Sequence, residues 1–229
     1  NLVMIGSRLS NILSLGNTTT AAVTNLDGTV RIRNSNNYSG GTLVNRGMTL
    51  EVDTGAAPGG STPLGSGGVE VYGIVQLAAD PQGYNGQASF LNAATGANAN
   101  SFVLRPGGAI IINGQLGQVG GGEGRWDDQG ALDLNGGTFR FNGITGAQTF
   151  ETIGALTARK GGIVQVVRTG SGSASLNLGA LTRADRGVLS IVTSAAGTLG
   201  IPGTTNTNFF DRVTTTSSVT LTGTTLNGA

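Results

Sequence analysis

Three stretches of the chain repeat one pattern: GALDLNGGTFRF at residues 130–141, GALTARKGGIVQV at 154–166 and GALTRADRGVLSI at 179–191. The three GAL tripeptides begin 24 and 25 residues apart. A constant period in the range of about 20–50 residues indicates stacked structural repeats. Each copy reads as a strand, a glycine corner and a second strand, without a helix between them. The repeat therefore predicts an all-β fold, a parallel β-helix (β-solenoid) with about 25 residues per coil.

The second strand of each copy indicates which side chains face the interior, because successive side chains of a strand point to opposite faces. Stacking the copies in equal steps predicts two inward apolar columns, Phe139/Val164/Leu189 and Phe141/Val166/Ile191, and one outward polar column, Arg140/Gln165/Ser190. The same alternation occurs earlier in the chain, in Val69-Glu70-Val71, in Val75-Gln76-Leu77 and at Ile110 and Ile112. A slip of one residue would turn Arg140 inward, so the register is well specified.

The composition agrees with a solenoid. The chain has 229 residues with 41 glycines, 5 prolines, no cysteine and 11% charged residues. Glycine suits corners because it adopts backbone conformations that other residues avoid, and collagen would need a strict three-residue period. The arginines are scattered and no apolar run is long enough for a membrane-spanning helix, so we predict neither a nucleic-acid partner nor a spanning segment. Low charge with abundant Thr, Asn, Ser and Gly favours an extracellular or bacterial cell-surface location.

The strand pattern continues along the chain, so we interpret residues 1–229 as one β-solenoid segment. An irregular start covers residues 1–37, and paired strands interrupted by a loop excursion cover 38–104. Regular GAL-type coils cover residues 105–229. The longest loop, from about residue 80 to 101, is expected to leave the rod, and loops on a rigid scaffold are where binding tends to occur.

The middle zone is similar to a known bacterial repeat. Residues 37–52 read NYSGGTLVNRGMTLEV and residues 63–77 read PLGSGGVEVYGIVQL. An aromatic residue, Ser-Gly-Gly-Thr, two strands around a glycine corner and a following Leu-Gly-x-Gly make this unit resemble the autotransporter-associated β-strand repeat, also called the passenger-associated transport repeat. The GAL copies resemble, less specifically, the large bacterial β-strand-repeat surface proteins that carry this unit. The resemblance implies a right-handed parallel β-helix that is exported, often to the bacterial surface, and it implies no catalytic residues.

Residues 120–128 contain the candidate metal ligands. Here GGGEG at 120–124 precedes Trp126, Asp127 and Asp128, which is similar to a glycine-rich calcium turn. Asp127 falls one place late and the motif occurs once, which favours a solvated loop anchored by Trp126; apart from this calcium candidate, we expect no cofactor. The indole of Trp126 has two interpretations: it stacks on a sugar ring, or it covers the core where the loop rejoins the rod.

Four cations fall at one corner of consecutive coils. They are Arg159, Lys160, Arg183 and Arg186, and in the aligned repeats they form a small basic ridge that faces water. The ridge is either a solvated corner or a contact for an anion or a glycan.

A catalytic role would require a cluster of acids or bases on one face of the rod. In the aligned repeats Asp133 lies over Thr157 and Thr182, so that column holds one acid, and Glu151 falls at a corner or a strand start in another column. The chain has no histidine and no cysteine, so the commonest catalytic triads are unavailable. We therefore predict no catalytic residues and no enzymatic activity.

The sequence favours a structural or adhesive exported surface protein, a rigid β-helical stalk or passenger segment that contacts the cell surface or matrix. Two alternatives stay open: a subunit that stacks end to end into an extracellular filament, and a glycan-processing β-helix enzyme. Residues 219–223 read as a strand and a corner, unlike the polar cap that a solenoid end needs. The expected partners are therefore other copies of the chain, or the rest of a longer chain, at open solenoid ends, and also surface glycans or proteins.

Overall fold

The structure is a computed structural model that describes part of the 229-residue chain. The described residues are 2–6, 21–25, 28–32, 41–52, 64, 67–77, 101–114, 125–126, 128, 130–193 and 211–216. Within these ranges the regular elements are all β-strands, and every strand pairing is parallel. The predicted all-β solenoid is confirmed, with about 27 residues per turn.

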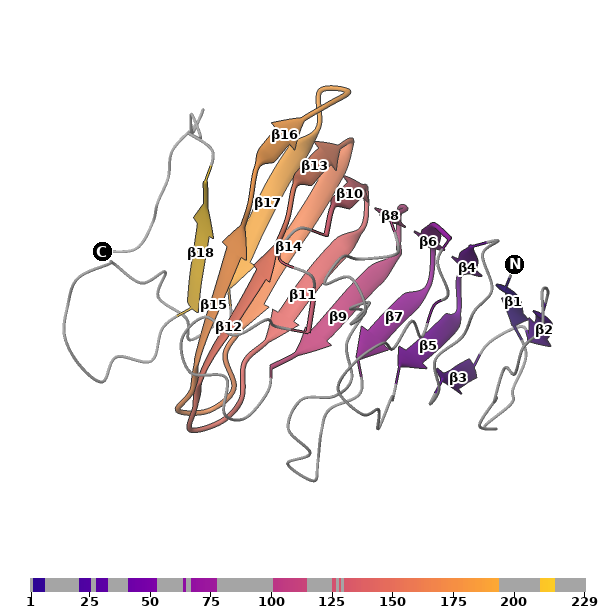
Figure 1. Ribbon diagram of the computed structural model, residues 1–229, viewed down its shortest axis with the longest axis horizontal. Coiled ribbons are helices and arrows are strands. Elements are labelled where there is room, and N and C mark those ends of the chain that lie inside the picture. The colour runs from indigo at the N-terminus through magenta and orange to yellow at the C-terminus, as the bar shows by residue number, and fades with distance from the viewer. Residues whose placement is uncertain are drawn as a thin grey trace.

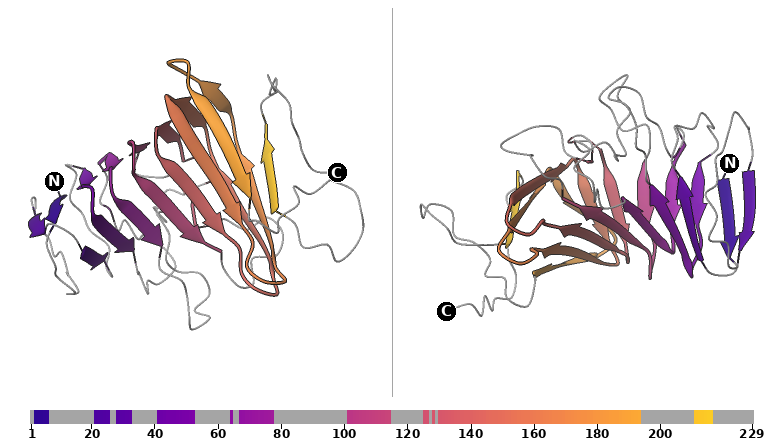
Figure 2. Two further views of the ribbon diagram at one scale, coloured as in Figure 1. Left: turned by 180° about the vertical axis from the view of Figure 1, so that it is seen from behind. Right: turned by 90° about the horizontal axis from the view of Figure 1, so that it is seen from below.

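Three sheets form the walls of the solenoid (Figures 1 and 2). The strands of the first wall are β1 (Leu2–Gly6), β2 (Ala21–Asn25), β4 (Thr42–Val44), β6 (Val69–Val71), β8 (Phe102–Leu104), β10 (Leu132–Asn135), β13 (Leu156–Arg159) and β16 (Leu181–Arg183). The strands of the second wall are β3 (Gly28–Ile32), β5 (Met48–Val52), β7 (Ile74–Leu77), β9 (Ala109–Asn113), β11 (Thr138–Asn142), β14 (Gly161–Val167) and β17 (Val188–Thr193). The strands of the third wall are β12 (Gln148–Ile153), β15 (Ser173–Leu178) and β18 (Asp211–Thr215).

The chain winds regularly from β4 onward. Each coil places one strand in the first wall and the next strand in the second wall, and from β10 onward a third strand completes the coil. The coils differ in length, because the paired positions Val69 and Phe102 are 33 residues apart, whereas Leu132 and Leu156 are 24 apart. At the N-terminal end β1 lies between β2 and β4, so the first strand of the chain is inserted inside its wall.

The strands of the second wall bury apolar side chains, and the predicted columns are confirmed for their first step. Three neighbouring pairs have the expected register: Phe139–Val164, Arg140–Gln165 and Phe141–Val166. Both phenylalanines and both valines are fully buried. The earlier strands alternate as predicted too, with buried Val69, Val71, Val75, Leu77, Ile110 and Ile112.

The predicted columns are wrong by two residues in the last coil. The observed pairs are Val164–Ile191, Gln165–Val192 and Val166–Thr193, where we predicted Leu189, Ser190 and Ile191 as the partners. A shift by an even number of residues keeps each side chain on its face of the sheet. Leu189, which pairs with Gly162, therefore still packs against the core and is partly buried.

A longer corner causes this shift. Between β13 and β14 the corner is Lys160 alone, whereas residues 184–187 separate β16 from β17. Lys160 has a φ of 50°, and Asp185 and Arg186 have φ values of 51° and 56°, a left-handed conformation that is unusual for residues other than glycine. The amide of Gly187 donates a hydrogen bond to the carbonyl of Ala184 at 2.7 Å, which closes a tight turn and takes up the extra residues.

Candidate functional site

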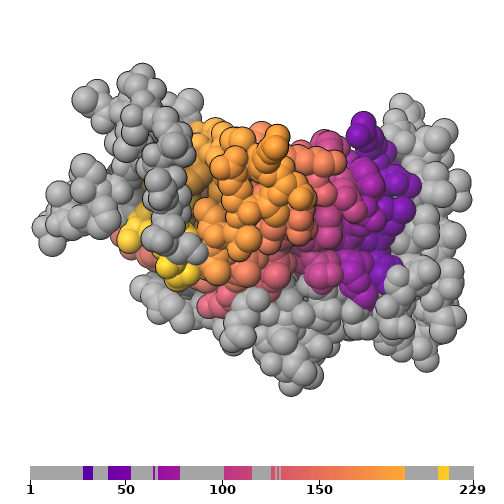
Figure 3. All heavy atoms as spheres, turned by 90° about the horizontal axis from the view of Figure 1, so that it is seen from above, coloured from indigo at the N-terminus to yellow at the C-terminus, as the bar shows by residue number. Residues whose placement is uncertain are grey.

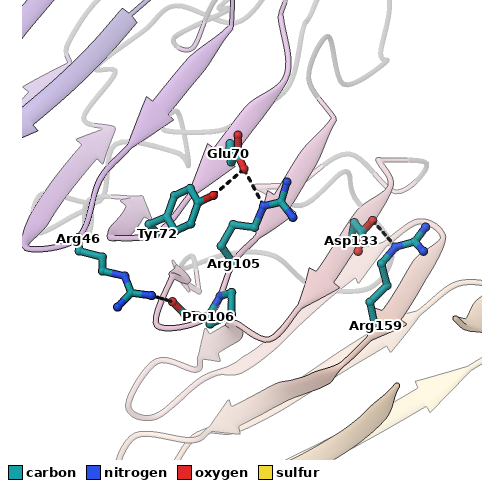
Figure 4. Close-up of polar contacts among 7 residues, drawn as sticks. All are labelled: Arg46, Glu70, Tyr72, Arg105, Pro106, Asp133 and Arg159. Atoms are coloured by element: carbon teal, nitrogen blue, oxygen red, sulfur yellow. Dashed lines mark hydrogen bonds and ion pairs between the residues drawn. The ribbon is translucent and has the colours of Figure 1, made fainter. Parts of the chain in front are cut away.

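Alternating charges line the outside of the first wall (Figure 4). Glu70 and Asp133 share one outward column, with Val103 between them. Arg105 follows β8 and donates from Nε to Oε1 of Glu70 at 2.6 Å, and the hydroxyl of Tyr72 donates to the same oxygen at 3.1 Å. The hydrogen bond with Glu70 raises the pKa of Arg105.

Arg159 continues this row and connects three successive coils. Its Nε donates to Oδ2 of Asp133 at 2.8 Å, and its Nη1 donates to Oδ2 of Asp185 at 3.0 Å. These bonds raise the pKa of Arg159, with Asp133 the stronger influence. A further contact between coils joins Nη2 of Arg46 to the carbonyl of Pro106 at 3.4 Å. The row therefore ties neighbouring coils together on the outside of the rod.

The acid column differs from the sequence interpretation in one respect. Asp133 lies over Thr157 and Thr182 as predicted, but the column also contains Glu70, which lies outside the GAL copies and was missed for that reason. Each acid receives a hydrogen bond from an arginine. The pair is therefore arranged as two ion pairs between coils rather than as two free carboxylates facing one substrate.

The four cations of the predicted basic ridge lie at the expected corner, but Arg183 takes an inward register position next to the buried Ala158, whereas Arg159 faces outward. Ala158 pairs with Arg183, and the carbonyl of Lys160 accepts a hydrogen bond from the amide of Val188 at 2.9 Å, which places the two corners side by side. Lys160, Arg183 and Arg186 are exposed. Arg159 differs from them because two carboxylates engage it. Contact of this ridge with an anion or a glycan stays a prediction.

Trp126 lies inside the protein rather than on its surface. Its side chain is fully buried, with ring centroids 4.6 Å from Phe102 and 5.7 Å from Phe139. The indole Nε1 donates to the carbonyl of Gly130 at 3.0 Å. The interpretation that Trp126 covers the core is therefore confirmed, and its ring faces are occupied by protein rather than open to a sugar.

The buried acid Glu151 was not recognised as an interior group from the sequence. It lies in the middle of β12, faces inward and is 3% exposed. Its carboxylate accepts hydrogen bonds from the amides of Arg125 at 2.9 Å, Trp126 at 3.4 Å and Thr152 at 3.3 Å. Arg125 is buried as well and donates from Nη1 to the carbonyl of Asn113 at 2.8 Å.

Burial dominates the electrostatics of Glu151. Desolvation raises its pKa from 4.5 to about 8, against the lowering effect of the three amide hydrogen bonds. Asp128 adds to the increase by charge repulsion. Glu151 therefore holds the backbone of residues 125–126 against the interior, and its surroundings are a packed junction rather than an open catalytic cleft.

The calcium candidates are only partly covered by the structure. Asp128 is described and exposed, whereas Asp127 lies outside the described residues. Within the described part of the chain, no group of three or more acidic side chains that could hold a metal ion is present. Calcium binding near residues 120–128 stays a prediction.

The fold defines the chain as a parallel β-solenoid protein. Comparison of the chain with known protein families, with curated proteins and with solved structures found no match. The described residues contain no helix that is long and apolar enough to cross a membrane.

Proposed function

We propose that this chain is a rigid β-helical segment of an exported surface protein, with a structural or adhesive role as a stalk. The observation that supports this proposal most directly is the unbroken parallel pairing of the first wall from β2 to β16. Repeat proteins gain their stability mainly from contacts between neighbouring repeats. Buried apolar side chains along the stacked coils and ion pairs between coils are suited to a rigid spacer.

The charged row on the first wall fits this role better than catalysis. Arg105 and Arg159 engage the acids Glu70 and Asp133, and Glu151 is occupied by backbone amides. Surface ion pairs contribute little stability individually, about 0–1 kcal/mol, but their positions favour the register in which the coils stack. The same surface presents outward polar side chains to a glycan or protein partner.

Location and activity are tested separately. An antibody raised against the purified chain is expected to label intact, non-permeabilised cells of the organism that encodes it. Labelling that requires permeabilised cells would contradict export. The purified chain is also incubated with a panel of polysaccharides, and no sustained cleavage is expected. Cleavage that the Asp133→Asn or Glu151→Gln variant abolishes would replace the stalk by the glycan-processing alternative.

A filament subunit is the second candidate function. One observation favours it: Ile191 lies at the end of an inward column, above Val164, and is 45% exposed. An exposed strand edge of this kind recruits other strands. Electron microscopy of the concentrated protein distinguishes the two functions, because a stalk segment gives short single rods whereas end-to-end stacking gives filaments of increasing length.

A further inference from the structure

The exposed large hydrophobic residues of the described chain lie on two neighbouring strands, β14 and β17. They are Ile163 (40% exposed), Val188 (63%), Ile191 (45%) and Val192 (38%). Ile163 pairs with Ser190, which lies between Val188 and Val192 on the same outward face. Three of these side chains therefore surround one serine and form a single patch; the residues from β14 to β17 are coloured orange in Figure 3.

The patch adjoins a free strand edge. β17 is the last described strand of the second wall, and the outer edge of residues 188–192 pairs with no strand among the described residues. A free edge presents backbone N–H and C=O groups that can bind another strand. The inward residues Leu189 and Ile191 are incompletely buried, so this edge offers apolar contacts on both faces.

The other two walls end differently. In the first wall Arg183 takes the inward register position next to Ala158. In the third wall Asp211 takes the position next to Ala174, where it is buried and accepts a hydrogen bond from the amide of Arg168 at 3.0 Å. Charged groups at inward positions oppose the addition of an apolar strand. The last coil therefore suits one added strand, on the second wall, better than a complete additional coil.

Three cations surround the beginning of this edge. Arg186 precedes Val188 by two residues, and the carbonyl of Lys160 accepts the amide of Val188 at 2.9 Å. Arg183 ends β16 at the same corner. Among the described residues, the ion pairs of this corner join Arg159 to Asp133 and to Asp185. They do not involve Lys160, Arg183 or Arg186, whose positive charges lie beside the apolar patch.

We propose that the free edge of β17 is the docking site for one extended peptide segment of a partner protein. The segment has apolar side chains at alternate positions, and carboxylates precede its first apolar residue. It adds parallel to β17, as the pairs of this fold do, so its acids lie beside Lys160, Arg183 and Arg186. Strand addition supplies affinity through main-chain hydrogen bonds and specificity through alternate side chains. The site requires only the last coil and is independent of the stalk function.

The test measures fluorescence anisotropy of labelled synthetic peptides added to the full chain. The probe is DEGVTVTI, and the control is the scrambled peptide TVVIGTDE, which has the same composition but joins its apolar residues in one run and carries its acids at the end. We expect saturable binding of the probe at least tenfold tighter than of the control, about 1.4 kcal/mol. Equal binding of the two peptides, or no saturable binding of the probe, would overturn the proposal.

Variants locate the site. Ile191→Lys places a charge at the inward position of the edge and is expected to weaken probe binding at least tenfold, whereas the matched variant Thr49→Lys, on β5, leaves binding unchanged. The double charge reversal Lys160→Glu with Arg186→Glu should weaken binding of the acidic probe and strengthen binding of the basic peptide KKGVTVTI. Circular dichroism confirms that each variant is folded. Unchanged binding by folded Ile191→Lys protein would overturn the proposal.

A second copy of the chain is the competing occupant. Sedimentation velocity of the chain without peptide is expected to give monomers at micromolar concentration. Self-association that Ile191→Lys abolishes would assign the edge to a second copy instead of a partner peptide. None of these outcomes bears on the cell-surface labelling or on the polysaccharide incubation, so failure of this inference is distinguishable from failure of the proposed function.

Discussion

The coils from β4 to β9 have two described strands each, whereas those from β10 to β18 have three. In the two-strand coils the inward side chains of the strands are apolar, with Thr42 as the exception. The three-strand coils differ because buried polar groups gather in the third wall or against it. These groups are Arg125, Thr149, Glu151, Ser173 and Asp211.

This difference in buried polar groups indicates that the third wall depends on specific hydrogen bonds. Thr149 Oγ1 donates to the carbonyl of Ser173 at 2.7 Å, and Asp211 accepts the amide of Arg168. Glu151 accepts the amides of the segment beneath β12. Burying a polar group without a partner is costly. A coil with a third strand is therefore stable only when these hydrogen bonds form. In the coils from β4 to β9, the described strands depend mainly on apolar burial.

The largest expected effect is at the junction of the two regions. Trp126→Ala removes the indole that packs between Phe102 and Phe139 and should lower the free energy of unfolding by about 3–5 kcal/mol. Chemical denaturation followed by circular dichroism measures this. The matched variant Phe150→Ala, on the outward face of β12, should lower the free energy of unfolding by clearly less. Equal costs for the two variants would mean that Trp126 does not organise the junction.

The second effect is the pH dependence of the three-walled region. Burial raises the pKa of Glu151 from 4.5 to about 8. Between these values the folded chain keeps a proton that the unfolded chain releases, so the free energy of unfolding falls as the pH rises through this window. The stabilisation is complete below about pH 4.5 and is lost as the pH rises through 8, and each unit of pKa difference is worth about 1.4 kcal/mol.

Thermal unfolding at pH 5, 7 and 9 tests this dependence. Glu151→Gln should reduce the decline of the melting temperature with pH, because the glutamine side chain has no proton to release. Glu70→Gln, on the outside of the coils from β4 to β9, should leave this decline as it is in the parent chain. A parent chain whose melting temperature is constant from pH 5 to 9 would contradict the assignment of Glu151.

The third effect should be equal in both regions, because two of their corners close in the same way: the amide of Gly108 donates to the carbonyl of Arg105 at 2.8 Å, and the amide of Gly187 donates to that of Ala184 at 2.7 Å. A Cβ at Gly108 would lie 2.0 Å from the carbonyl oxygen of Val71, and a Cβ at Gly187 would lie 2.2 Å from that of Ala158. Gly108→Ala and Gly187→Ala should therefore each lower the free energy of unfolding, measured by chemical denaturation, by about 1–3 kcal/mol. Gly161→Ala is the control, since nothing lies within 4 Å of its Cβ. A cost at only one corner would show that the corners differ between the regions.

The smallest effect concerns the surface ion pairs. A double-mutant cycle on Glu70 and Arg105, in the coils from β4 to β9, should give a coupling energy below about 1 kcal/mol that decreases in high salt. The same cycle on Asp133 and Arg159, in the three-walled region, should give a similar value. Coupling above about 2 kcal/mol for either pair would mean that the row contributes to stability more than its exposure suggests.

Much of the fold could be predicted because the repeats are regular where they occur. Alternation identified the inward faces of β11 and β14, and equal spacing identified their register. The same alignment failed at β17 because two extra corner residues are absorbed by left-handed Asp185 and Arg186. The sequence does not show that these two residues adopt a backbone conformation typical of glycine. The alignment therefore assumed equal spacing between successive coils.

The candidate site was less predictable than the fold. The basic corner followed from the alignment, but the pairing of Glu70 with Arg105 joins segments 35 residues apart that lie outside the GAL copies. The segment from Gln148 to Ile153 places Thr149 and Glu151 inside and Phe150 only partly buried on the outside. Apolar alternation would favour the opposite orientation, with Phe150 inside.

By itself, the sequence determined the parallel stack, because its apolar residues alternate and recur at nearly constant steps, and only stacked strands bury such a pattern. The tertiary structure alone decided the orientation of the third wall. There, amides from residues 125–126 lie within hydrogen-bonding distance of Glu151, and these bonds offset part of the cost of turning a carboxyl group inward. Such a balance depends on groups that approach each other only after the coil has closed, so a local pattern does not contain it.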